Sequence, residues 1–147
     1  MGTIKIISKK LRILFFSYVL LSSPTMATKL VISCPQGEIS FKVELAQTPE
    51  ERAKGLMNRE TLGEDEGMLF LFPEPRASTM WMKNTPLSLD MLFIDKESKI
   101  LAIAEKTTPF SLKQIGPIEN TAQVLELLGG TVKKTGITKG CVLRPIL

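Results

Sequence analysis

The chain has 147 residues, with 19 Lys and Arg against 15 Asp and Glu, no His, and a net charge of +4. All four excess positive charges lie before residue 13, so the rest of the chain is neutral and lacks the basic footprint of a nucleic-acid-binding protein. The missing histidine excludes Ser-His and Cys-His nucleophile pairs and the usual zinc ligand.

The first 27 residues have the pattern of a secretory signal peptide. Four basic residues precede an apolar run over residues 13–21 that only Ser17 interrupts, and Thr25-Met26-Ala27 offers a cleavage site. The alternative is an uncleaved membrane anchor, but this run covers only about half of a bilayer core. We therefore expect cleavage after Ala27, a periplasmic or secreted protein, and one domain of residues 28–147 without a membrane span.

Two cysteines remain after the expected cleavage, Cys34 and Cys141. In an oxidising compartment an even number of cysteines favours a disulfide, and closing a loop of about 100 residues would add about 4 to 5 kcal/mol of stability. Two buried free thiols are the alternative. A third interpretation is lipid attachment at Cys34, because Val31-Ile32-Ser33 resembles the sequence that precedes lipidated cysteines.

The first predicted elements are a hairpin and a short helix. Residues 38–45 alternate apolar and polar side chains, which predicts a half-buried strand, and Pro35-Gln36-Gly37 joins it to a strand over residues 30–33. Thr48-Pro49-Glu50-Glu51 then predicts a helix start, with a Thr N-cap followed by Pro and, three residues after the cap, Glu. Gly55 is suited to end this helix.

The middle of the chain is predicted to be rich in strands. An apolar run over residues 67–72 indicates a buried strand that Pro73 and Pro75 end. Three more strands are predicted over residues 79–83, 89–95 and 99–104. Residues 107–117 contain two prolines, one glycine and little periodicity, which predicts a loop that can act as a flap.

The last elements complete the predicted fold. Asn120 and Gln123 resemble a capping box, which predicts a helix over residues 120–128 that ends at Gly129-Gly130. Two strands are expected over residues 131–132 and 141–146. The fold class is therefore mainly β (α+β), a bent antiparallel sheet or partial barrel of seven to eight short strands with two short helices.

Several linked motifs point to a family. They are Glu51-Arg52-x-x-Gly55-Leu56-Met57-x-Arg59, Gly67-Met68-Leu69-Phe70-x-Phe72, Trp81-Met82-Lys83-Asn84-Thr85, Leu89-Asp90 and Phe93-Ile94-Asp95. In these motifs the chain resembles the bacterial and archaeal family called domain of unknown function 192. Cys141 is a departure, because the family usually has Asp after the glycine at this point. The resemblance implies a small, often exported, mostly β domain without an agreed activity.

Asp90 is the most conspicuous polar residue of these motifs. It lies in the predicted strand over residues 89–95, and if its face is buried its carboxyl group must be neutral or paired. The candidate partners are Lys83, Arg52, the Trp81 indole and the Asn84 amide. Two interpretations stay open, a structural network that pins the strand and a polar floor of a ligand pocket.

The surrounding motif residues also allow two interpretations. Trp81, the only tryptophan, is most often a core residue in such a strand, but it can be a stacking platform for a flat ligand. Asn84-Thr85-Pro86 is first of all a turn, which can present polar groups at a pocket edge. The candidate pocket comprises Trp81, Lys83, Asn84, Thr85 and Asp90, with Arg52 or Arg59 at its edge.

These residues lead to three hypotheses of different class. The first is a non-catalytic binding module for an unknown small molecule, with no cofactor and no metal. The second is a structural or interaction protein of the cell envelope, with another envelope protein as partner and the motif as core. The third is a hydrolase that uses Asp90 or Glu105 as acid or base, with Lys83 as electrostatic support. It would require two carboxyl groups about 5 to 10 Å apart.

Overall fold

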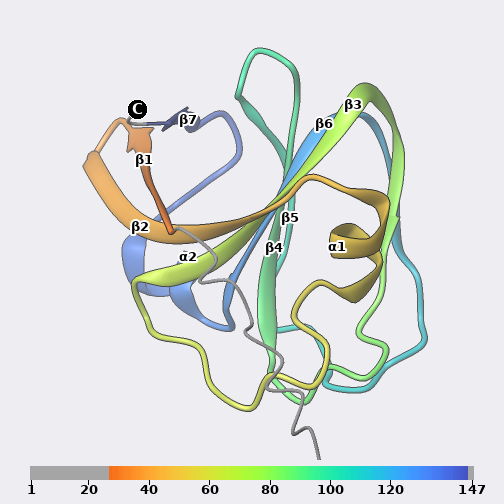
Figure 1. Cartoon of the computed structure of the whole chain (residues 1–147). Helices are drawn as coiled ribbons and strands as arrows, with labels where there is room; N and C mark the ends of the chain where they lie inside the picture. Colours follow the sequence, from red (N-terminus) through yellow and green to blue (C-terminus); the bar gives the residue numbers. More distant parts are fainter. Residues whose placement is uncertain (1–26, 146–147) are drawn as a thin grey trace, which may run out of the picture.

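Seven strands and two short helices make up the described part of the protein (Figure 1). The computed structural model describes residues 27–145, so the predicted signal peptide lies outside the described residues, except for Ala27. The strands are β1 (Thr28–Cys34), β2 (Gly37–Ala46), β3 (Glu66–Met80), β4 (Leu89–Ile94), β5 (Ile100–Ala104), β6 (Ile115–Leu128) and β7 (Val142–Pro145), and the helices are α1 (Pro49–Lys54) and α2 (Thr131–Thr135). Among these residues no helix is long and apolar enough to cross a lipid bilayer.

All seven strands belong to one sheet in the order β5-β4-β6-β3-β2-β1-β7. Neighbouring strands are antiparallel, including the predicted β1–β2 hairpin, except that β2 and β3 run parallel with α1 in the connection between them. The mainly β fold with two short helices is therefore confirmed.

The sheet curls until its two edge strands meet at one end. The Ile100 N–H donates to the Cys141 carbonyl (2.9 Å), the Gly140 N–H donates to the Ile100 carbonyl (2.9 Å), and the Leu143 N–H donates to the Ser98 carbonyl (2.8 Å). These bonds join the start of β5 to β7 and give the sheet the form of a half-barrel. They also cover part of both edges, which would otherwise expose unpaired backbone groups.

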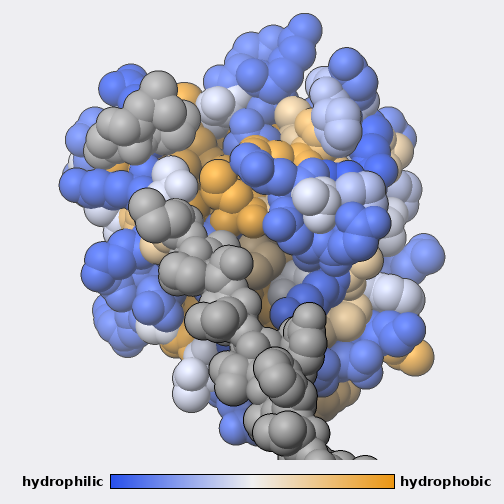
Figure 2. Space-filling model, viewed as in Figure 1, coloured by the Kyte–Doolittle hydropathy of each residue, from blue (hydrophilic) through white to orange (hydrophobic). Residues whose placement is uncertain are grey.

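The two faces of the sheet carry two separate apolar clusters. The cluster inside the curl includes Leu92 of β4 and Leu125 of β6, whereas the cluster on the α1 side includes Met91 and Val124 of the same two strands. Every residue of β4 is buried, as expected for a central strand that is covered on both faces. On the face seen in Figure 2, apolar surface is confined to limited areas between hydrophilic side chains.

Helix α1 forms as its sequence predicts. The Thr48 hydroxyl accepts a hydrogen bond from the Glu51 N–H (3.1 Å), and the Glu51 carboxylate accepts one from the Thr48 N–H (3.0 Å). Bonds from the backbone N–H groups of Thr48 and Gln47 lower the pKa of Glu51. Gly55 ends the helix at φ +47°, where a Cβ atom would lie only 2.9 Å from the Phe70 ring.

The prediction that Pro73 and Pro75 end a strand is wrong, because β3 continues to Met80. Between Leu71 and Arg76 of β3, the pairing with β6 advances only from Gln123 to Thr121. The prolines therefore lie in a bulge, where a missing backbone N–H costs no ladder hydrogen bond. The strand predicted over residues 79–83 is correspondingly the end of β3, and residues 81–83 lie outside it.

The helix predicted over residues 120–128 is also wrong, because this segment belongs to β6. It lies between β3 and β4, with alternate side chains packed into the two apolar clusters. An apolar run covered on both faces lacks the alternation of a half-buried strand, so its sequence does not distinguish it from a buried helix. The strand predicted over residues 131–132 is instead the start of α2.

A disulfide bond joins Cys34 at the end of β1 to Cys141 just before β7, with the two Cα atoms 4.7 Å apart. Of the three interpretations left open for these cysteines, the structure has the disulfide, and because the bond uses both sulfur atoms, it leaves no thiol for lipid attachment at Cys34. The linked residues are 107 positions apart, so the bond closes almost the whole described chain into one loop.

The double substitution Cys34→Ala/Cys141→Ala is expected to lower the free energy of unfolding by about 4 kcal/mol, because the unfolded chain regains the freedom of a very long loop. Urea denaturation of both oxidised proteins measures this difference. The wild-type protein under reducing conditions should unfold at the same urea concentration as the double variant. Equal stability of the oxidised wild type and the variant would contradict the prediction.

Candidate functional site

A cavity of about 370 Å³ lies on the α1 side of the sheet, next to the end of β3 and residues 81–85. Its lining combines four basic side chains, three aromatic rings and one acidic side chain: Arg52, Lys54, Arg76, Lys83, Phe70, Phe72, Trp81 and Glu126. Volume and composition lie in the range of small-molecule sites, which are mostly apolar with a few convergent polar groups. Four of the predicted pocket residues, Trp81, Lys83, Thr85 and Arg52, come together here.

Aromatic rings hold three of the four cations in place. The Arg76 guanidinium lies 4.4 Å and the Arg52 guanidinium 5.8 Å from the centre of the Phe72 ring, and the Lys83 Nζ lies 5.1 Å from that of Trp81. Arg52 also donates to the backbone carbonyls of Leu71 (3.0 Å) and Gln47. Such contacts orient a cation without neutralising its charge.

The basic side chains of the cavity lack ion-pair partners among the described residues, although, besides the backbone hydrogen bond from Thr48, the Arg52 charge helps to lower the pKa of the neighbouring Glu51. Within residues 27–145, none of Arg52, Lys54, Arg76 and Lys83 forms an ion pair. The lining therefore offers guanidinium and ammonium donors that an incoming anion can bind.

Glu126 is the one acidic residue of the lining, and it is only 4% exposed. In β6 it stands directly across from Met68 of β3 and Met91 of β4, which belong to the apolar cluster on the α1 side. Burial raises the pKa of Glu126 from 4.5 to about 8, so the carboxyl group is mainly neutral at pH 7. Within the described part of the chain, no hydrogen bond to this carboxyl group contributes to the shift of its pKa.

Trp81 is 47% exposed and lies outside the strands, so the interpretation of this residue as core is wrong. Lys83 is exposed as well, whereas Thr85 is buried and its hydroxyl donates to the Lys83 carbonyl (3.0 Å). The tryptophan side chain thus forms part of the cavity wall together with Lys83.

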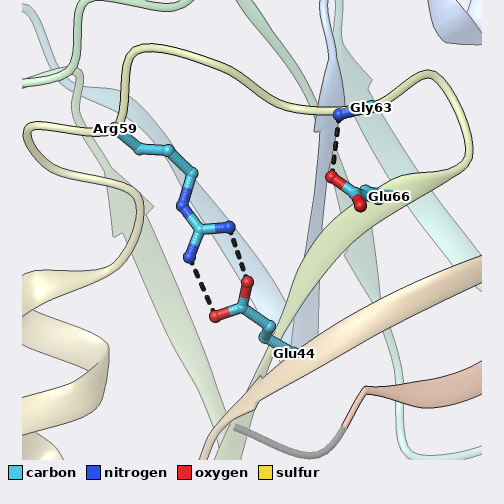
Figure 3. A network of polar contacts seen from close by, with 4 residues as sticks. All are labelled: Glu44, Arg59, Gly63 and Glu66. Carbon is cyan, nitrogen blue, oxygen red and sulfur yellow. Dashed lines mark hydrogen bonds and ion pairs between the residues drawn. The ribbon is translucent and has the colours of Figure 1, made fainter. Parts of the chain in front are cut away.

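Arg59 and Asn84 do not line the cavity and have structural partners instead. Arg59 makes a two-pronged ion pair with Glu44 of β2, at 2.5 and 2.9 Å, which raises the pKa of Arg59 (Figure 3). Asn84 forms a turn at φ +53°, and its carbonyl accepts a hydrogen bond from the Asn58 N–H (2.7 Å). Both residues fasten the segment after α1 to the rest of the fold.

Asp90 is fully buried on the inside of the curl, on the opposite face of the sheet from Glu126. Its carboxylate accepts hydrogen bonds from the backbone N–H groups of Lys106 (2.8 Å), Gly130 (3.0 Å) and Val132 (2.8 Å). None of the predicted partners of Asp90 contributes, and Asp90 is not part of the cavity lining. The geometry fits the structural network, in which one side chain ties β4 to the start of α2 and to the loop after β5.

Sequence reasoning missed Glu126, which takes the position at the cavity that had been assigned to Asp90. The wrongly predicted helix over residues 120–128 concealed the role of Glu126, because only a strand places Glu126 opposite Met68 and Met91. The available signal was a single acid inside the run Val124-Leu125-Glu126-Leu127-Leu128. An acid in a fully apolar strand is buried whichever face it occupies.

The substitution Asp90→Ala is expected to lower the free energy of unfolding by about 3 kcal/mol or more, because three backbone N–H groups lose their acceptor. Urea denaturation measures the loss, and faster hydrogen exchange at Lys106, Gly130 and Val132 locates it. Asp95→Ala is the control, since Asp95 accepts one hydrogen bond from Lys99 in an exposed turn. Equal effects of the two substitutions would contradict the prediction.

The substitution Glu126→Gln is expected to stabilise the protein at high pH. Between about pH 4.5 and pH 8 the unfolded chain loses the Glu126 proton while the folded protein keeps it, so the stability of the wild type falls with rising pH. Over about three pH units the loss is on the order of 4 kcal/mol, and the variant avoids it. Urea denaturation at pH 4 and pH 9 tests this, with the exposed Glu105→Gln as control. A constant difference between Glu126→Gln and wild type at both pH values would refute it.

Two solved structures resemble this chain over most of its length. A protein from Sinorhizobium meliloti 1021, provisionally assigned as a transcription regulator, is 43% identical with a TM-score of 0.78, over 80% of this chain and 92% of that one. A protein of unknown function from Novosphingobium aromaticivorans DSM 12444 is 34% identical with a TM-score of 0.80, over 84% of this chain and 89% of that one. None of the functionally curated proteins matches the chain.

The sequence profile of domain of unknown function 192, described as an uncharacterized ACR, matches residues 31–145. This range contains every motif on which the resemblance rested, and it covers β2 to α2 completely. The chain therefore belongs to the domain of unknown function 192 family.

Proposed function

We propose that this protein is an exported binding module for a small organic anion, which it holds in the cavity beside α1. The observation that carries the proposal is the charge of the lining, in which four basic side chains without acidic partners surround apolar and aromatic walls. A carboxylate or a phosphate group would bind to Arg76 and Lys83, and an apolar part of the ligand would contact Trp81 and the Phe70 ring.

Export is part of the same proposal. It rests on the signal-like pattern of residues 1–27, and the Cys34–Cys141 disulfide supports it, because such bonds persist in oxidising compartments. A periplasmic or secreted module would meet small acids outside the cytoplasm. The transcription-regulator assignment of the Sinorhizobium meliloti protein is not carried over, since residues 28–147 have no excess of basic charge.

A second candidate is an interaction protein of the cell envelope. It is favoured by the three exposed large hydrophobic side chains of the described residues, Trp81, Phe110 and Leu112. They lie on two segments that two backbone hydrogen bonds hold together, from the Met82 N–H to the Ser111 carbonyl and from the Phe110 N–H to the Thr85 carbonyl. The hydrolase hypothesis has less support, because the cavity has a single acidic residue in its lining, while Glu105 is exposed and does not line it.

Ligand binding can be followed through Trp81, because it is the only tryptophan and lines the cavity. Benzoate and phenyl phosphate are expected to change its fluorescence in a saturable manner, whereas benzyl alcohol and benzylamine are not. Arg76→Ala should weaken the binding of both acids by about 10- to 100-fold, because a charged hydrogen bond of about 1.5 to 3 kcal/mol is lost.

Lys139→Ala is the matched control, since Lys139 is exposed and does not line the cavity. It removes one positive charge from the protein and should leave the affinity unchanged. Binding of benzylamine with the affinity of benzoate, or no saturable response to either acid, would contradict the proposal. An equal loss of affinity in Arg76→Ala and Lys139→Ala would show that only the net charge of the protein matters, and this would also contradict the proposal.

A further inference from the structure

Glu126 places an acid at the floor of a cavity whose other charged residues are basic. An ionised carboxylate at this position would repel an anionic ligand and would leave water without gaining a partner, which is costly. A neutral carboxyl group has one O–H donor and behaves differently toward an anion. The two protonation states of this group would therefore present different chemistry to an anion in the cavity.

Burial among uncharged neighbours favours the neutral form of Glu126 and is the cause of its raised pKa. Its cross-strand neighbours in β3 and β4, Met68 and Met91, carry no charge. On the other side of Met68, the neighbouring strand β2 places Glu44 opposite it, and Glu44 is already paired with Arg59. The remaining charged groups of the cavity are Arg52 and Lys54 of α1, Arg76 of β3 and Lys83 of the following segment.

We propose that Glu126 acts as a hydrogen-bond donor at the floor of the cavity, so that the bound anion carries a second oxygen acceptor opposite its charged group. One end of the ligand contacts Arg76 and Lys83, and the other end accepts the Glu126 proton in a hydrogen bond. Dicarboxylates, keto acids and acid esters have this chemistry, whereas a ligand with an amine at that end lacks the acceptor. This inference rests on the proposed function and assigns a specific role within it.

The proposal links ligand affinity to pH. The ligand binds the protein only while Glu126 holds its proton, so its affinity falls as the pH rises through about 8. Lysine and arginine side chains in general keep their charge across this range. Carboxylate probes are ionised well below it, so the protein rather than the probe supplies the titrating proton.

The experiment measures the dissociation constant of terephthalate at pH 6.5 and pH 9.5 by Trp81 fluorescence. In the wild type the constant is expected to rise by about tenfold or more between the two pH values. Glu126→Gln should bind at both pH values with one affinity, because the amide N–H donates at any pH. Glu126→Met should bind weakly at both, and benzoate, which lacks the second acceptor, should respond less to pH than terephthalate.

The outcomes separate this inference from the proposed function. Equal affinity of the wild type at both pH values, or the same pH dependence in Glu126→Gln, overturns the role of Glu126. The proposed function survives that result if Arg76→Ala still weakens terephthalate binding. If the wild type binds neither terephthalate nor benzoate at either pH, the proposed function and this inference both fail.

Discussion

The burial of β4 and of the end of β6 on both faces is the constraint on which the rest of the structure depends. Each of these buried segments carries one acid, Asp90 in β4 and Glu126 in β6, and both side chains are almost completely buried. Asp90, on the inside of the curl, is satisfied by three backbone N–H groups, and in return it holds the start of α2 and the loop after β5 in place. Glu126, on the α1 side, lies between Met68 and Met91 and has no such partners among residues 27–145. The two faces therefore differ, because Asp90 is bonded to the backbone on one face and Glu126 lines the cavity on the other.

The open face is organised by aromatic side chains. Phe72 lies under Arg76 and within reach of Arg52, and Trp81 lies beside Lys83. These rings let positive charges stay at a partly apolar surface without the acids that would normally pair with them. Arg76 stands at the end of the bulge, where β3 pairs again with Thr121 of β6, and it lines the cavity.

Most of the fold could be predicted where sequence patterns are local. The alternation over residues 38–45 and the capping residues Thr48 and Glu51 depend on neighbours along the chain, and both predictions agree with the structure. The patterns failed at residues 120–128, where the partners are β3 and β4 and no local signal separates a strand from a buried helix. The predictions of the site residues divide in the same way, into those that agree with the structure and those that do not. The motif residues Trp81, Lys83, Thr85 and Arg52 came together, while Arg59 and Asn84 had partners that only the folded chain reveals.

Within the part of the chain that the structure describes, Glu126 is unpaired, and this is itself informative about function. Replacing it by an apolar residue would remove a burial cost that rises with pH, and Met68 and Met91 show that such residues fit the adjacent positions. A sequence shaped by stability alone would have little reason to keep an acid there, and local violations of such rules are expected at functional sites. The Cys34–Cys141 disulfide, in contrast, increases the stability of the fold, because it restrains the unfolded chain. Neither cysteine lines the cavity. The disulfide that stabilises the fold and the buried acid that destabilises it at high pH therefore lie in separate parts of the molecule.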